Sequence, residues 1–444
     1  MGVSGSGKTA ALRTWMHQDA VQGQAFGIID VEETLSESCL GYLEHLGVEP
    51  ERVVVCDPTA TEATLPLNFL HVPEGAHPHV VIEDLVFAMR RAWADVWGPR
   101  LDDILRHSLA LLQEHRLTLA ELPLLLSDKK FRETLAEQSK DERLRLFFIS
   151  HLGNVPAREW RVWIEAVRNK ASAFAGNPFV TPMIAADTCV DFRSIMDEGK
   201  FLVVNLPERV LKDSGKLLGM MLVTRIYAAA LQRPEGSLPW FLYADEFQSI
   251  ASRSFLDLVT RSRKRGVGVI VAHQNLTQPP FDRDPGFLDT VLANCATQCF
   301  FSVGRTDAER LAKEVFPATG TIPKKTKKKD ALWGGDEVQS FYSVSEEREH
   351  AIHEMETQQP RECFIKLKGG DTYVATTYDL PEAGDGSDLA RASVRLHGVP
   401  PESIVARRIE RLASLTPQKG KRGRFDPSAR PSEDLGLPAD PYAE

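Results

Sequence analysis

The tightest constraint on this chain lies at its amino end, where Gly2 to Thr9 read GVSGSGKT. This is the complete pattern of a phosphate-binding Walker A loop, with glycines at both ends of the loop followed by lysine and threonine. Glycines let backbone N–H groups curl around phosphate oxygens without clashes from a Cβ atom. The residues expected to contact nucleotide are Gly2, Val3, Ser4, Gly5, Ser6, Gly7, Lys8, Thr9 and Ala10.

The two residues that close the loop have the chemistry of an ATP site. We expect Lys8 to reach the β- and γ-phosphates and the Thr9 hydroxyl to ligate magnesium. The helix that starts here adds the positive end of its dipole. A loop of this kind normally follows a buried β-strand, but Met1 directly precedes Gly2. Either the start is misplaced or truncated, or another segment fills the place of that strand.

A second motif, WFLYADE, supplies carboxylates at Asp245 and Glu246. It reads as an apolar strand that ends in two acidic residues, as in a Walker B motif. Asp245 would hold magnesium and Glu246 would polarise the attacking water. The alternative is a strand end with a solvated acidic turn.

Two further candidates follow this strand. Gln274 comes just after the apolar run GVIVA, at the strand edge where open parallel sheets bind ligands. An amide there can contact the γ-phosphate or the water; the alternative is an ordinary loop residue. Arg263 lies in a basic stretch that closes the preceding helix, Ser254 to Arg265. It either caps that helix or reaches a neighbouring subunit's nucleotide as an arginine finger.

Short apolar runs that alternate with helical segments predict an α/β fold, a RecA-like P-loop NTPase with a mostly parallel central sheet. The interval from 78 to 185 lacks such runs and has apolar residues at helical spacing, which predicts an inserted all-α domain. We therefore expect a first P-loop part (1–77), the insertion (78–185), a second part with Walker B (186–380), and a C-terminal extension (381–444). The last is expected to be disordered after Ser414.

Composition limits the partners and the location of the chain. The 444 residues carry a net charge of −9, so contact with nucleic acid requires locally basic surface. No secretory signal is found, and no apolar run reaches the ~20 residues of a membrane helix. We expect a cytoplasmic protein that meets the cytoplasmic face of the inner membrane through partners.

Several stretches together resemble the HerA/FtsK superfamily, and within it the TraG/TraD-like coupling proteins of conjugation and type IV secretion. These stretches cover about 2–371 and include VVVCDP, DFRSIMDEGKFLVVNLP, DEFQ, SRKRGVGVIVAHQNLTQ and NCATQCFFSVGRTDAERLA. The resemblance implies a DNA-translocating ATPase that assembles as a homo-hexamer, uses ATP and Mg²⁺, and carries an inserted all-α domain. It assigns family roles to Lys8, Thr9, Asp245, Glu246 and Gln274, and places Arg263 where coupling proteins carry a finger arginine.

The same resemblance implies DNA as cargo and relaxase or secretion-channel proteins as partners. The sequence contains neither the membrane anchor of many coupling proteins nor the first strand. Two other functions therefore stay open: a scaffold or switch that binds ATP but moves nothing, and an N-terminally truncated, inactive remnant.

Overall fold

A parallel β-sheet forms the centre of the computed structural model, which describes residues 1–276, 285–316, 320–324, 341–370, 372–381 and 383–415. The sheet has the order β2-β3-β1-β4-β5, and every neighbouring pair is parallel. Its strands are β1 (Phe26–Asp30), β2 (Val53–Cys56), β3 (Phe201–Asn205), β4 (Trp240–Ala244) and β5 (Val267–Val271). The α/β class and the mostly parallel central sheet are thus confirmed.

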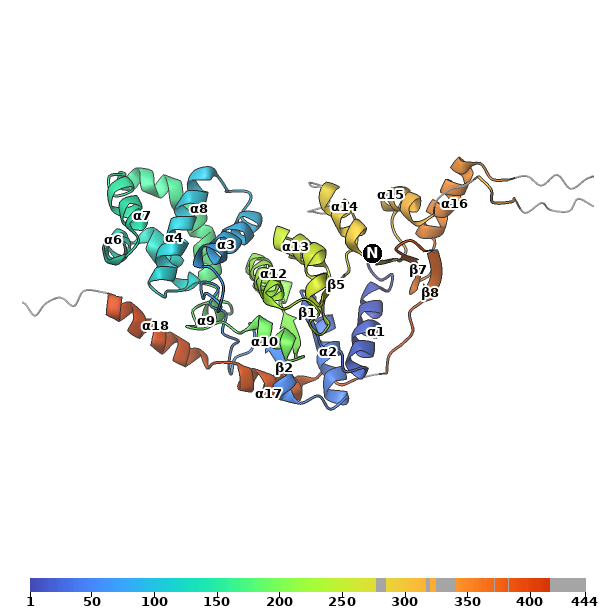
Figure 1. Ribbon diagram of the computed structural model, residues 1–444, viewed down its shortest axis with the longest axis horizontal. Coiled ribbons are helices and arrows are strands. Elements are labelled where there is room, and N and C mark those ends of the chain that lie inside the picture. Colours follow the sequence, from blue (N-terminus) through green and yellow to red (C-terminus); the bar gives the residue numbers. More distant parts are fainter. Residues whose placement is uncertain (277–284, 317–319, 325–340, 371, 382, 416–444) are drawn as a thin grey trace, which may run out of the picture.

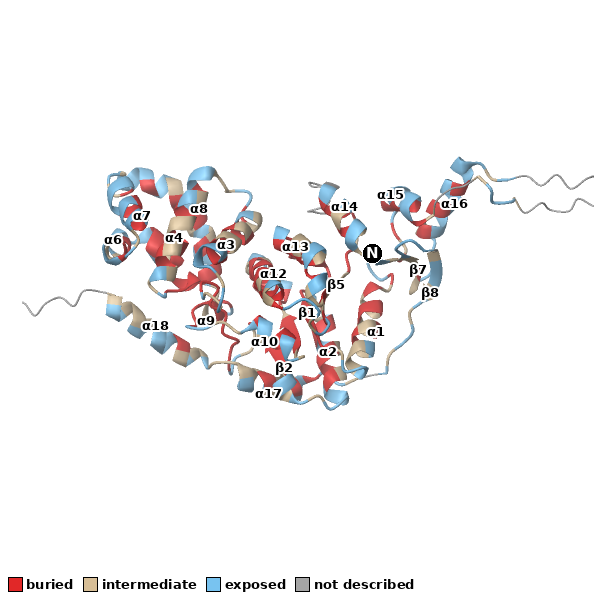
Figure 2. Ribbon diagram, viewed as in Figure 1, coloured by how far each residue is buried: buried red, intermediate tan, exposed pale blue. Residues whose placement is uncertain are grey.

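Helices cover both faces of this sheet, because successive strand residues point to opposite sides. On one face Phe26 and Ile28 pack with Leu12 and Met16 of the first helix. On the other face Ile29 belongs to the larger apolar core that includes the long helix α12. The helices around the sheet are α1 (Lys8–Val21), α2 (Thr34–His45), α10 (Phe192–Asp197), α11 (Glu208–Leu211), α12 (Asp213–Gln232), α13 (Arg253–Arg261) and α14 (Pro285–Asn294). Figure 2 shows this buried interior between exposed outer surfaces.

Residues 78–185 contain helices and no strand. Their α-helices are α3 (Pro78–Ala92), α4 (Pro99–Glu114), α5 (Leu122–Ser127), α6 (Lys129–Gln138), α7 (Glu142–Arg145), α8 (Ala157–Ala175) and α9 (Thr181–Ile184). They gather on one side of the sheet (Figure 1), where α3 packs on α12. The division of the chain into domains stays a prediction.

A second sheet lies on the other side of the molecule (Figure 1). Here β6 (Thr297–Phe300), β7 (Glu362–Leu367) and β8 (Thr372–Thr376) pair antiparallel in that order. Two helices, α15 (Arg305–Val315) and α16 (Val344–Glu356), pack together beside it. The apolar run QCFFSV at 298–303 has the same composition as the strands of the parallel sheet, but β6, which overlaps this run, belongs to this separate sheet.

Two helices make up most of the described part of the C-terminal extension. Helix α17 (Ser387–His397) packs on β2, and α18 (Pro401–Leu415) packs against α9. We expected disorder after Ser414, and residues 416–444 lie outside the part of the chain that the structure describes. No helix among the described residues has the length and apolarity needed to cross a membrane.

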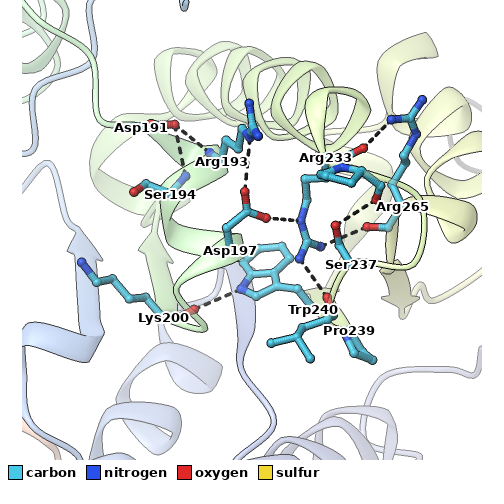
Figure 3. Close-up of polar contacts among 12 residues, drawn as sticks. Asp191, Arg193, Ser194, Asp197, Lys200, Arg233, Ser237, Pro239, Trp240 and Arg265 are labelled. Atoms are coloured by element: carbon cyan, nitrogen blue, oxygen red, sulfur yellow. Dashed lines mark hydrogen bonds and ion pairs between the residues drawn. The ribbon is translucent and has the colours of Figure 1, made fainter.

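A buried arginine fixes the amino edge of the sheet (Figure 3). The Arg233 side chain is fully buried and forms an ion pair of 2.7 Å with Asp197 at the end of α10. Its other nitrogens donate to the carbonyl oxygens of Arg265 (3.1 Å) and Leu238 (2.8 Å), and Arg265 donates back to the Arg233 carbonyl. This cluster holds the start of β5 against the end of α12.

We predict that Arg233→Met destabilises the protein by about 3 kcal/mol, because it leaves buried carbonyl oxygens and part of a carboxylate without donors. The matched control is Arg193→Met, since Arg193 pairs with the same Asp197 at 3.2 Å but is 45% exposed. The control should cost less than about 0.5 kcal/mol. Urea denaturation followed by tryptophan fluorescence measures both. Equal losses in the two variants would contradict the role given to Arg233.

Candidate nucleotide site

The loop from Gly2 to Gly7 lies where the two sheets approach each other. The Gly2 N–H donates to the carbonyl oxygen of His273, just after β5, at 3.3 Å. The Val3 N–H donates to the carbonyl of Ser302, just after β6, at 2.8 Å, and the Arg361 N–H donates to the carbonyl of Ser6 at 2.7 Å. Backbone bonds from both sheets therefore fix the loop at the start of α1.

Two glycines of the loop are required by its geometry. Gly7 has φ +116°, and a Cβ atom there would lie 2.9 Å from the Cα atom of Arg361. A Cβ atom on Gly2 would lie 2.6 Å from both Phe301 Cβ and Ser6 Oγ. Both approaches are closer than real Cβ atoms make, so these positions accept only glycine without a shift of backbone.

Lys8 points back into the loop. Its side chain is buried, and Nζ donates to the carbonyl oxygens of Gly2 (2.8 Å) and Val3 (3.1 Å). Burial lowers the pKa of Lys8, while the nearby carboxylates of Glu246 and Asp245 act to raise it. The ammonium group is thus positioned inside the curve of a loop with backbone N–H groups, as a phosphate site requires.

Thr9 and Asp245 meet although they are far apart in sequence. Thr9 Oγ1 donates to Asp245 Oδ2 at 2.9 Å. Burial raises the pKa of the Asp245 carboxyl, and the bond from Thr9 acts in the opposite direction. A hydroxyl and a carboxylate are hard oxygen ligands, and magnesium typically takes one or two protein ligands beside phosphates and water. These two residues fit a magnesium ion.

Glu246 and Gln274 also lie together at the carboxyl ends of β4 and β5. Gln274 Nε2 donates to Glu246 Oε1 at 2.7 Å, and Gln248 Nε2 donates to the other carboxylate oxygen. Glu246 has left-handed backbone angles, φ 46° and ψ 43°. Such a conformation in a non-glycine residue costs of order 1 kcal/mol or more and is concentrated at functional sites. The strain and both amides fix the direction of this carboxylate.

Arg263 lies elsewhere. The helix expected through Arg265 is shorter: α13 ends at Arg261, and Arg263–Arg265 form a 3-10 turn that leads into β5. The exposed Arg263 is therefore at the amino end of β5, while Gln274 follows its carboxyl end. The five residues of β5 span roughly 16 Å, so Arg263 does not join the other candidates within one chain.

Two charged residues near the site were not identified from the sequence. Arg361 has φ +75°, its backbone lies against the Walker A loop, and its guanidinium pairs with Asp379. Glu32 follows β1, and its pKa is raised by burial and by the charges of Glu246, Glu208, Asp30 and Asp245. No motif signals Arg361, whereas Glu32 follows an apolar run that ends in a carboxylate.

We predict that Gly7→Ala disrupts the loop more than Gly5→Ala. Both glycines have positive φ, so both variants carry backbone strain, but only at Gly7 does a Cβ atom meet backbone, that of Arg361. Gly5→Ala should cost about 1 kcal/mol, and Gly7→Ala clearly more. The midpoint of thermal unfolding, measured without nucleotide, checks this order. The reverse order would show that the loop and Arg361 are not packed together.

Comparison with known proteins identifies the fold. No family model matches the chain, and no curated protein does. Among solved structures, the bacterial conjugative coupling protein TrwB, lacking its first 70 residues, matches with a TM-score of 0.56 and 17% identity over 86% of this chain and 85% of that one. Other structures of TrwB hold the non-hydrolysable ATP analogue ADPNP, or ADP and Mg²⁺, at TM-scores of 0.55. VirB4 of Thermoanaerobacter pseudethanolicus matches with a TM-score of 0.55 and 14% identity, over 86% of this chain and 88% of that one. The chain thus has the RecA-like P-loop fold shared by a conjugative coupling protein and VirB4.

Proposed function

We propose that this protein is an ATP-driven motor of the coupling-protein type, which hydrolyses ATP with magnesium to move DNA in conjugation, type IV secretion or a related transfer. The main support for the proposal is a pair of hydrogen bonds, from Thr9 to Asp245 and from Gln274 to Glu246. Both lie beside the buried Lys8. The complexes of TrwB with ADPNP and with ADP and Mg²⁺ support the choice of nucleotide and metal.

Each residue has a task that follows from its position. The Walker A backbone and Lys8 would bind and orient the phosphates, and Thr9 and Asp245 would hold the magnesium. When bound, that ion would neutralise negative charge on the phosphates. Glu246 accepts a hydrogen bond from the attacking water and directs it toward the γ-phosphate. Gln274, bonded to Glu246 at 2.7 Å, links the state of that carboxylate to the loop after β5.

In a ring of subunits, Arg263 could act on the nucleotide of a neighbouring subunit. Arg263 is exposed and lies at the opposite end of β5 from its own Walker A loop, so it is free to approach the nucleotide of a neighbour. A guanidinium stays charged and offers forked donors to phosphate oxygens. A homo-hexamer would supply such neighbours, with DNA in the channel and the helical part, 78–185, in contact with DNA or with relaxase or channel proteins. We place the protein in the cytoplasm, at the inner membrane through those partners.

The alternative is a scaffold or switch that binds ATP without moving DNA. Its site could share every contact described here, because binding and hydrolysis precede translocation. The rate of ATP hydrolysis with and without DNA distinguishes the two. A motor accelerates when DNA is added, and a scaffold does not.

We predict that Lys8→Ala reduces ATP turnover by roughly 10²-fold or more, because it removes the loop's own cation.

Glu246→Gln should retain ATP binding and lose about 10²- to 10⁴-fold in hydrolysis. Glu32→Gln is the matched control, since this exposed carboxyl lies near the same charges without a bond to Gln274. Equilibrium binding of a fluorescent ATP analogue and phosphate release measure the two effects. A loss of less than tenfold in Glu246→Gln would assign the base to another residue.

We predict that Arg263 acts across the subunit boundary. Arg263→Ala should reduce hydrolysis by roughly 10³-fold or more, as the loss of an arginine finger does. Mixing this variant with Lys8→Ala should restore part of the activity, because some interfaces then combine an intact site with an intact arginine. Lys264→Ala, from the same exposed turn, is the control and should retain activity.

If Arg263 only caps its own helix, Arg263→Ala would cost about 1 kcal/mol of stability and little activity. Absence of recovery in mixtures that are shown to co-assemble would exclude the role in trans.

A further inference from the structure

A cavity of about 440 Å³ lies between α10, α12 and the segment that follows Phe69. Because α10 leads into β3 and α12 ends ahead of β4, the cavity lies near the amino ends of the parallel strands, away from the nucleotide site. Its volume is in the range of pockets that bind small organic molecules. Much of its wall is apolar and comes from Pro73, Val190, Phe192, Ala228 and Ala229.

Arg225 of α12 lines this cavity, and its side chain is only partly satisfied. The residue is 7% exposed. Its hydrogen bonds within the described part of the chain all come from Nη2, which donates to carbonyl oxygens of residues 68–71, that of His71 at 2.7 Å. The Nε N–H is buried and has no acceptor among the described residues. Buried charges normally have a charged or hydrogen-bonding partner, so part of this guanidinium is available for one.

Two titratable side chains affect Arg225 without neutralising it. Burial raises the pKa of the Cys189 thiol to about 11, so the thiol carries no charge at pH 7. Burial also raises the pKa of Asp84 to about 6, against the opposing effect of Arg225. No ion pair joins Asp84 to Arg225 among the residues that the structure describes. The guanidinium therefore has no directly bound counter-charge within this part of the chain.

Three carboxylates in the wall of the cavity are already bonded to other groups. Asp191 accepts from the first N–H groups of α10, at 2.9 and 3.2 Å, and Asp197 pairs with the buried Arg233 (Figure 3). Glu198 pairs with Lys200 at 2.7 Å. None of these acids bonds to Arg225, which leaves the arginine as the buried cation that faces the cavity.

We propose that this cavity binds a small organic carboxylate, with the carboxylate on Arg225 and an apolar body against the wall formed by α10 and α12. A guanidinium offers forked donors that match a carboxylate. Phosphate sites usually add several backbone N–H groups, and here Asp191 already occupies those at the start of α10. Glu74, the remaining carboxylate of the wall, is exposed, so solvent screens its charge.

The probe is 4-phenylbutyrate, which joins a carboxylate to an apolar body. Its neutral counterpart is 4-phenylbutan-1-ol, and inorganic phosphate tests for a bare anion. Binding to the full chain is measured by ligand-observed NMR titration, without nucleotide or magnesium. The inference rests on the cavity alone and not on the proposed ATPase activity.

Two variants test the placement of the probe. Ala228→Leu fills the cavity and leaves the bonds of Arg225 in place, and Arg225→Lys keeps the charge but loses the fork. The matched control is Ala110→Leu, because Ala110 is also a half-buried helical alanine but lies in α4, outside the cavity wall. Circular dichroism and thermal unfolding verify that each variant folds. If Arg225→Lys does not fold, Ala228→Leu decides.

The Kd of 4-phenylbutyrate should be on the order of 1 mM, as expected for a molecule of this size, and the alcohol should bind at least ~10-fold more weakly. Ala228→Leu and Arg225→Lys should each weaken binding at least ~5-fold, and Ala110→Leu should not.

Equal binding of acid and alcohol, or no saturable binding up to about 20 mM, would overturn the proposal and leave Arg225 with the structural task of holding residues 68–71. Binding that Ala228→Leu does not change would place the probe elsewhere and overturn it as well. Tighter binding of phosphate than of 4-phenylbutyrate would exclude the choice of a carboxylate. Because nucleotide is absent throughout, none of these results bears on the ATPase proposal.

Discussion

The structure depends on backbone hydrogen bonds that hold the first seven residues between two sheets. Gly2 bonds to the segment after β5, Val3 to the segment after β6, and Ser6 accepts from Arg361 beside β7. Each of these three bonds uses the main chain, so none of them occupies a side chain. The close approach of Gly7 to Arg361 follows from the same arrangement. The small antiparallel sheet is thus part of the nucleotide site, although none of the motif residues lies in it.

The two ends of the parallel strands have different tasks. At the carboxyl ends, polar side chains meet: Thr9 with Asp245, and Gln274 with Glu246. At the amino end, Arg233 fixes the turn before β5 through the Arg265 carbonyl (Figure 3). Arg263, in the same turn, is exposed. A strand of roughly 16 Å separates these ends, so Arg263 lies away from the Walker A loop of its own chain.

The sequence was informative where chemistry requires a residue type at fixed spacing. GVSGSGKT and WFLYADE located the loop and the strand end, and apolar runs identified the strands of the parallel sheet. The pairing of the strands could not be read from the sequence, because a run such as QCFFSV would have the same composition in either sheet. Its partner β7 is also more than sixty residues away. Arg361 was missed for a related reason: it reaches the loop through its backbone, which leaves no pattern in the sequence.

The helices of the C-terminal extension pack on two different parts of the molecule. Ser393 of α17 bonds to the backbone of both Val53 and Val55 in the edge strand β2. Further on, Arg408 of α18 pairs at 2.6 Å with Glu121, a carboxylate buried in the helical part. A buried charge needs its partner, so this ion pair is specific rather than incidental. The two helices therefore connect the helical part, residues 78–185, to the edge of the sheet (Figure 1). The contacts of α17 and α18, together with the packing of α3 on α12, hold this part against the sheet.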